Sequence, residues 1–164
     1  MNHTIIIKEY DSSDQDEVLD LILDIQQKEY QISITQEDQP DLMKIESFYR
    51  TGSGNFWVAL YDDQVIGTVG LLDIQEQQAA LRKMFVSKAY RGGSWGASTQ
   101  LLNQAILWAR EHDLSAILLG TTPQFTAAHR FYEKNHFVEI TKEQLPVHFP
   151  VMEVDKKFYR LSLK

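Results

Sequence analysis

Hydrophobic and polar positions alternate over several short segments of this chain and recur at helical spacing over others. A high content of β-branched and aromatic residues predicts strands over residues 4–10, 56–61, 65–73, 78–86, 136–140 and 157–163. Residues 114–120 form a continuous apolar run, which is typical of a strand buried on both faces. Apolar residues three and four positions apart predict helices over residues 14–30, 41–49, 96–112 and 125–135.

The order of these elements predicts one mixed sheet of about seven strands with helices on both faces, an α/β or α+β fold. Asp62, Asp63 and Gln64 separate two of the strands and predict a hairpin turn. Residues 141–154 contain two prolines and predict a long loop before the last strand. A length of 164 residues suits a single domain over residues 1–164.

The composition excludes several classes of site. The chain has no Cys, so it offers no disulfide, no cysteine nucleophile and no thiolate metal site, and a reducing cytoplasm is the expected setting. His129, His136 and His148 lack metal-ligand spacing, and we expect no metal. No apolar run approaches the ~20 residues of a membrane helix. Residues 1–9 lack the layout of a signal peptide.

Charge is distributed unevenly along the chain. The net charge is −7, and residues 1–50 contain 12 of the 23 acidic residues but only 4 of the 16 basic ones. A chain this acidic is a poor candidate for general nucleic-acid binding. Residues 82–91 contain Arg82, Lys83, Lys88 and Arg91 and no acid, which suggests a small anionic ligand. On charge alone, a solvated strand edge and loop is an equal alternative.

The basic stretch ends in a glycine-rich turn that leads into a predicted helix. Glycines let the backbone approach a ligand closely, and a helix start offers free N–H groups and partial positive charge. With Lys88 and Arg91 adding full charges, the turn predicts a pyrophosphate site, although it could also simply reverse the chain. It lacks the Gly-Lys-Ser/Thr of a P-loop and the Gly-x-Gly-x-x-Gly of a dinucleotide site.

A second motif, A-A-H-R-F-Y-E-K-N-H-F, occupies residues 127–137. Together the two motifs resemble those of GNAT-family N-acetyltransferases, an Arg/Gln-x-x-Gly-x-Gly/Ala turn and a later A-x-x-F-Y-x-K-x-G-F helix. His136 stands where that family has Gly. The turn fits in two registers, Arg91-x-x-Ser94-x-Gly96 or, with two extra residues, Gly96-x-Ser98. We favour the second register, because the Leu-Leu pair of the family's helix then falls three and four residues later, at Leu101 and Leu102.

The resemblance implies a GNAT fold, in which the sheet is splayed between its fourth and fifth strands and acetyl-CoA lies in the gap. The backbone of Met84, Phe85 and Val86 would then bind the pantetheine arm. The N–H of Phe85 or Val86 would polarise the thioester carbonyl. The remaining expected cofactor contacts are Arg91, Gly92, Gly93, Ser94, Trp95, Gly96, Ala97 and Ser98 at the pyrophosphate, with Thr122 and Tyr132.

Tyr132 would be the general acid of the reaction that the resemblance implies. When an amine attacks a thioester, the leaving group is a thiolate, with a pKa near ~8.5 by analogy with Cys, whereas a phenol titrates near ~10. The phenol therefore stays protonated and can donate to the sulfur as charge develops. The alternative is a core aromatic residue beside Phe131.

The acceptor implied by the resemblance is a primary amine on a small molecule or a peptide. Glu29, Glu37 and Asp38 lie in the acidic N-terminal third, which lines the acceptor side in this family, and they would steer a cationic amine. A solvated acidic surface is the alternative. Phe149 and Met152 of the long loop are candidates for an apolar wall.

Two other functions stay open at this point. The fold could serve as a non-catalytic acyl-CoA-binding sensor that regulates a partner, or the basic turn could bind another nucleotide. Dimerisation is common in the family, so a homodimer is possible, whereas neither a nucleic-acid partner nor a membrane partner is expected.

Overall fold

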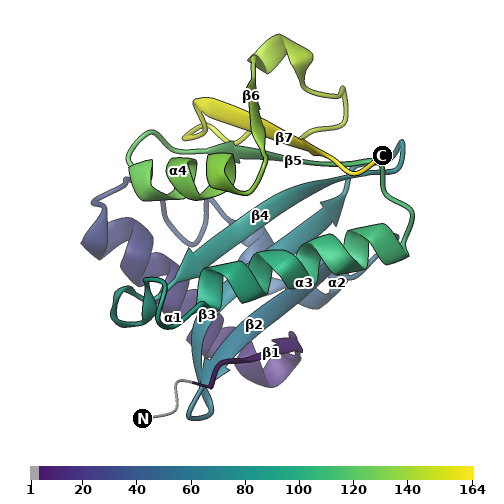
Figure 1. The fold of residues 1–164 in the computed structure, drawn as a ribbon. Helices are drawn as coiled ribbons and strands as arrows, with labels where there is room; N and C mark the ends of the chain where they lie inside the picture. The colour runs from purple at the N-terminus through teal and green to yellow at the C-terminus, as the bar shows by residue number, and fades with distance from the viewer. Residues whose placement is uncertain (1–3) are drawn as a thin grey trace.

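The computed structural model describes residues 4–164, which form a seven-stranded sheet in the order β1-β2-β3-β4-β5-β7-β6 (Figure 1). Only β4 and β5 pair in parallel, and every other neighbouring pair is antiparallel. The strands are β1 (Ile6–Glu9), β2 (Asn55–Tyr61), β3 (Gln64–Asp73), β4 (Gln78–Val86), β5 (Ala116–Thr121), β6 (Val138–Ile140) and β7 (Lys157–Ser162).

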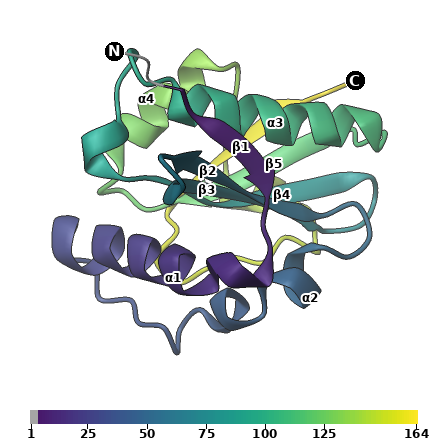
Figure 2. The ribbon, with the colours of Figure 1, turned by 90° about the horizontal axis from the view of Figure 1, so that it is seen from below.

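Four α-helices cover the sheet, with α1 and α2 on one face and α3 and α4 on the other (Figure 2). They are α1 (Gln15–Leu23), α2 (Ile45–Tyr49), α3 (Ala97–Glu111) and α4 (Thr126–Lys134). The predicted elements are therefore confirmed, with their ends shifted by a few residues. Among residues 4–164, no helix is long and apolar enough to cross a membrane.

The helix predicted over residues 14–30 is divided into three parts. A 3₁₀ turn (Ser12–Asp14) precedes α1, and a π-helical segment, η2 (Asp24–Glu29), follows it. The N-terminal cap is Asp11, which accepts a hydrogen bond from the Ser13 N–H. Ile25 and Gln26 of the π-helical segment line a pocket between β4 and β5.

Both faces of the sheet bury apolar side chains. On the α3 face, Leu101 and Leu102 pack with Val69 and Leu71. On the opposite face, apolar side chains of α1 and α2 pack with β2 and β3, among them Val18, Ile22, Ile45, Tyr49, Phe56 and Val65. The continuous apolar strand β5 has both faces covered, as its sequence predicted.

The sheet opens between β4 and β5. The two strands pair only where Gln78–Ala80 meets Ala116–Leu118. Beyond that point β4 continues to Val86, and no strand of residues 4–164 pairs with its β5-facing edge. The splayed sheet that the resemblance implied is thus confirmed.

A β-bulge lies in the part of β4 that leaves β5. The register between β3 and β4 shifts here, and Lys83 has a φ of +57°. The Thr68 hydroxyl donates a 2.6 Å hydrogen bond to the Lys83 carbonyl, which fixes the irregular backbone. Because a bulge bends its strand and increases the local twist, it helps β4 diverge from β5.

A buried polar cluster fastens this bulge to the segment before α2. The Lys83 ammonium donates to Gln39 Oε1 at 2.5 Å and lies 3.8 Å from the Asp41 carboxylate. The Tyr49 hydroxyl donates to the same carboxylate at 2.5 Å. Gln39 also exchanges two amide hydrogen bonds with Gln26 of η2. Three segments remote in sequence are therefore tied together at the bend in β4.

We expect the Tyr49→Phe substitution to lower the free energy of unfolding by about 2 kcal/mol, because it removes a donor from a buried carboxylate. Tyr10→Phe is the matched control, since Tyr10 is buried in the same layer but its hydroxyl has no hydrogen bond within residues 4–164. Urea denaturation of the two variants measures the difference. Equal stability of both variants would show that the cluster contributes nothing to the fold.

Candidate active site

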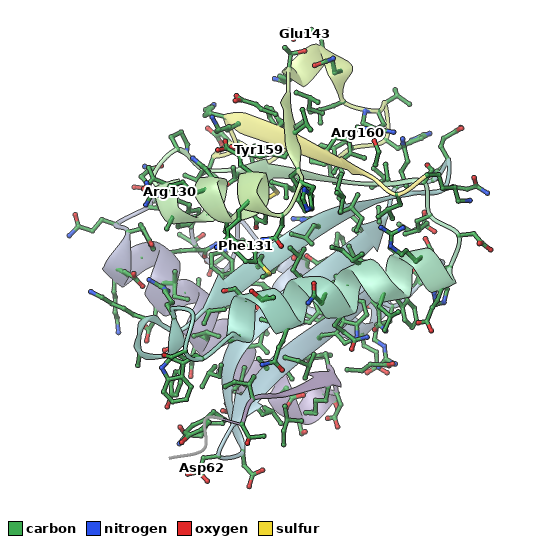
Figure 3. The ribbon with its side chains drawn as sticks, viewed as in Figure 1. Asp62, Arg130, Phe131, Glu143, Tyr159 and Arg160 are labelled. Atoms are coloured by element: carbon green, nitrogen blue, oxygen red, sulfur yellow. The ribbon has the colours of Figure 1, made fainter. Side chains whose placement is uncertain are left out.

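A pocket of about 350 Å³ occupies the gap between β4 and β5. One wall is the free edge of β4, residues 81–86, and the other is the end of β5 with Thr122. Side chains of α4, of η2 and of the loop before β7 close the pocket around these strands. Figure 3 shows Phe131, one of the lining residues, on the side of α4 that faces α3 and β4.

The first turn of α3 lies at one end of this pocket. Gly96 precedes the helix with a φ of +71°, a conformation that favours glycine, and its carbonyl accepts the first helical hydrogen bond from Gln100. The N–H groups of the first turn have no partner within the helix. Ser98 in this turn and Gly92 before it both line the pocket, so an anion bound here would meet N–H donors and the positive end of the helix dipole.

Arg91 is held by other groups of the protein. Its Nε donates to the Val86 carbonyl at 2.8 Å, and its two terminal nitrogens bind both carboxylate oxygens of Glu29. This pairing holds the pKa of Glu29 below its ordinary value. Arg91 therefore joins the end of β4 to η2 as well as lining the pocket. Glu29 belongs to this ion pair, and its place on the acceptor side stays a prediction.

The other predicted residues of the turn have different surroundings. Gly93 and Ser94 are exposed at its tip. The Trp95 ring packs at 4.9 Å from that of Tyr90, and Ala97 is buried in the core beside the sheet. None of these four residues lines the pocket.

Tyr132 of α4 projects into the pocket from the opposite side. Its side chain is 5% exposed, and its ring packs against Phe137. Within residues 4–164 no group hydrogen-bonds the hydroxyl. Burial, and then the charge of Asp155, raise the pKa of Tyr132 above its usual value, which keeps the phenol protonated. Thr122 lines the same wall, and its carbonyl is 3.1 Å from a ring nitrogen of His129.

Charged side chains of β4 and of the loop before β7 also line the pocket. Burial raises the pKa of Asp155 to about 6, against the opposing effect of Arg82 and Lys83. Burial lowers the pKa of Lys83 to about 8, while Asp41 opposes the change. Among residues 4–164, no group of three or more His, Asp or Glu side chains is arranged to hold a metal.

The absence of a side chain at Gly120 of β5 leaves room for the Asp155 carboxylate. A Cβ atom at Gly120 would lie 2.7 Å from the Asp155 carboxylate, so a larger residue would displace it. Asp155 directly follows the loop that the sequence predicted beside the acceptor, but no motif marks it as a pocket residue. Phe149 and Met152 of that loop line the pocket, as expected.

The acidic N-terminal residues do not line this pocket. Asp38 closes a turn in which it accepts a hydrogen bond from the Thr35 N–H at 3.0 Å, and Glu37 beside it is exposed. Neither residue lines the pocket, and among the described residues Asp155 is the one carboxylate that does. The basic residues that line the pocket are Arg82, Lys83 and Arg91, all from the basic stretch that the sequence singled out.

Comparison with known proteins identifies the family. Residues 19–137 match the model of the acetyltransferase (GNAT) family. This chain belongs to the GNAT family. An acetyltransferase of that family from Staphylococcus aureus Mu50 superposes with a TM-score of 0.95 at 40% identity, covering 98% of this chain and all of the other.

Two further relatives differ in what they share with this GNAT chain. The N-acetylaspartate synthetase of Danio rerio is 35% identical over 99 residues, which are 59% of this chain; the chain spans about a third of that relative's length. The PaiA N-acetyltransferase of Thermoplasma acidophilum, solved in complex with coenzyme A, shares the fold, with a TM-score of 0.74 at 15% identity over 97% of this chain and 99% of the other.

Proposed function

We propose that this GNAT protein transfers the acetyl group of acetyl-CoA to a primary amine. The observation that carries the proposal is one pocket bordered by three features: an unpaired edge of β4, the first turn of α3 and a buried tyrosine hydroxyl. Each suits a different part of a thioester cofactor. The cytoplasmic location stays a prediction from the absence of Cys, and the homodimer stays a prediction from the family resemblance.

The residues present fit acetyl-CoA. The free backbone groups of Met84, Phe85 and Val86 would hydrogen-bond the amide groups of the pantetheine arm, much as a neighbouring strand would. The N–H groups at the start of α3, with Gly92 and Ser98 nearby, would hold the pyrophosphate. Support for this assignment comes from the related fold that has been solved with coenzyme A.

Acetyl-CoA supplies an acetyl group activated as a thioester. In the proposed reaction Asp155 takes a proton from the acceptor ammonium, and the free amine attacks the carbonyl carbon. The N–H of Phe85 or Val86 hydrogen-bonds the carbonyl oxygen as negative charge develops. As the new C–N bond forms and the C–S bond breaks, the Tyr132 hydroxyl would donate its proton to the departing sulfur. The nitrogen would lose its second proton as the amide forms, and that proton would restore the Tyr132 phenol, directly or through water.

Asp155 suits the role of general base because of its environment. A base works best when its pKa is near the working pH, and a carboxylate of ordinary pKa is a weak base for an ammonium. Burial raises the pKa of Asp155 to about 6, while the proximity of Arg82 and Lys83 keeps it ionised at neutral pH. Its charge also acts on Tyr132, so the proposed base and acid lie near each other in the pocket.

Replacing Tyr132 by Phe tests the proposed acid. We expect turnover to fall roughly 100-fold, the lower end of the usual effect of general catalysis, with coenzyme A affinity nearly unchanged. A thiol-release assay and calorimetric titration measure the two quantities, with Tyr159→Phe as the control, because the Tyr159 hydroxyl bonds Glu133 instead of lining the pocket. Binding of coenzyme A without turnover of any amine by the wild type would favour the sensor function.

The dependence of kcat/KM on pH tests the proposed base. The carboxylate is the active form, so activity should fall as the pH drops through about 6. Asp155→Asn should lower kcat/KM at least about 100-fold and remove this acidic limb. Glu153→Gln, at an exposed site in the same loop, should keep the wild-type profile. An unchanged acidic limb in Asp155→Asn would exclude Asp155 as the base.

A further inference from the structure

Arg82 projects into the pocket without a carboxylate partner. Within residues 4–164 no Asp or Glu oxygen lies within 4.0 Å of its guanidinium. Two other arginines of the chain differ in this respect, since Arg50 pairs with Glu9 and Arg91 with Glu29. An unpaired guanidinium in a partly enclosed site has lost water without gaining an anion.

The surroundings of Arg82 fix its position but leave donors free. Its guanidinium lies over the rings of Phe48 and Tyr49, at 5.7 and 6.0 Å from their centroids. One terminal nitrogen is 3.3 Å from Met152 Sδ, a weak acceptor. Since a guanidinium has five N–H donors, most remain available for a ligand.

The neighbouring cation is already neutralised by the protein. Lys83 is bound by Gln39 and faces Asp41, so it does not compete for an anion in the pocket. Across from β4, Asp155 is close enough to Arg82 for their charges to interact, yet the two form no ion pair. The pocket thus presents two opposite charges, the Arg82 guanidinium and the Asp155 carboxylate, that do not pair with each other.

We propose that the acceptor is a small amine that carries a carboxylate, such as a free amino acid, and that Arg82 binds this carboxylate. The inference rests on the proposed acetyl transfer. A zwitterionic acceptor would place its ammonium group toward Asp155 and its carboxylate toward Arg82, matching both charges. Arginine binds carboxylates through two parallel hydrogen bonds, which also orient the amine.

Matched pairs of acceptors test the proposal on the wild-type protein. The panel contains β-alanine, L-alanine and L-aspartate, each beside the compound in which every carboxylate is replaced by an amide, assayed by thiol release from acetyl-CoA. The preferred acid should exceed its amide in kcat/KM by roughly 10-fold or more, the effect of losing a charged hydrogen-bond partner. Steering of cations by the acidic N-terminal third predicts the reverse order, because the amides carry net positive charge. Equal or better use of the amides overturns the carboxylate site and leaves acetyl transfer intact.

Binding of the N-acetylated products, measured by NMR titration without turnover, separates the two proposals. If no amine is acetylated but the N-acetylated acid binds more tightly than its amide, the carboxylate site stands and acetyl transfer fails. If neither turnover nor preferential binding of the acid is seen, both fail.

Substitutions of Arg82 test whether this residue binds the carboxylate. Arg82→Gln should raise KM for the acid roughly 10- to 100-fold while changing KM for the amide less than about 3-fold. Arg82→Lys should recover part of the loss, and Arg110→Gln, an exposed site at the end of α3, should match the wild type. An equal fall in kcat for acid and amide, with KM unchanged, would mean that Arg82 only supports the fold.

Discussion

The separation of β4 from β5 is the feature on which the rest of the site depends. A parallel pair that ends after residues 78–80 leaves backbone donors and acceptors of β4 without a neighbouring strand, an arrangement that costs free energy unless something else uses those groups. The bulge at Lys83 and the buried cluster around Asp41 hold β4 in this bent course. The interaction of Arg91 with Val86 and Glu29 fixes the end of the strand next to the start of α3.

This arrangement gives the pocket two chemically different ends. At the start of α3, uncompensated N–H groups and the helix dipole favour a phosphate. Toward the loop before β7, Arg82 and Asp155 present opposite charges on facing walls, and the Tyr132 hydroxyl lies in the same pocket. Because the pKa shifts of Asp155 and Tyr132 both arise mainly from burial, the enclosure of the pocket itself keeps the phenol protonated and brings the pKa of the carboxyl closer to neutrality.

Features encoded by local sequence could be predicted, and those that depend on distant contacts could not. Periodicity and turn residues identified the strands and helices, and two short motifs identified the turn at Gly96 and the helix that carries Tyr132. The partner of Arg91 lies 62 residues away, so nothing near either residue reveals that Glu29 is committed to an ion pair. Arg82 could be recognised as basic, but its unpaired state follows from where three separate segments fold. Asp155 lies in an irregular loop, where no periodicity indicates which side chains point inward.

A crystal structure of the protein with coenzyme A tests the central claim most directly, namely that the open sheet is a thioester site. The account predicts the pantetheine arm between residues 84–86 of β4 and the end of β5, with the pyrophosphate at the first turn of α3 and the thiol within hydrogen-bond reach of Tyr132. Coenzyme A bound elsewhere, or a complex in which β4 pairs with β5 along its full length, would contradict it.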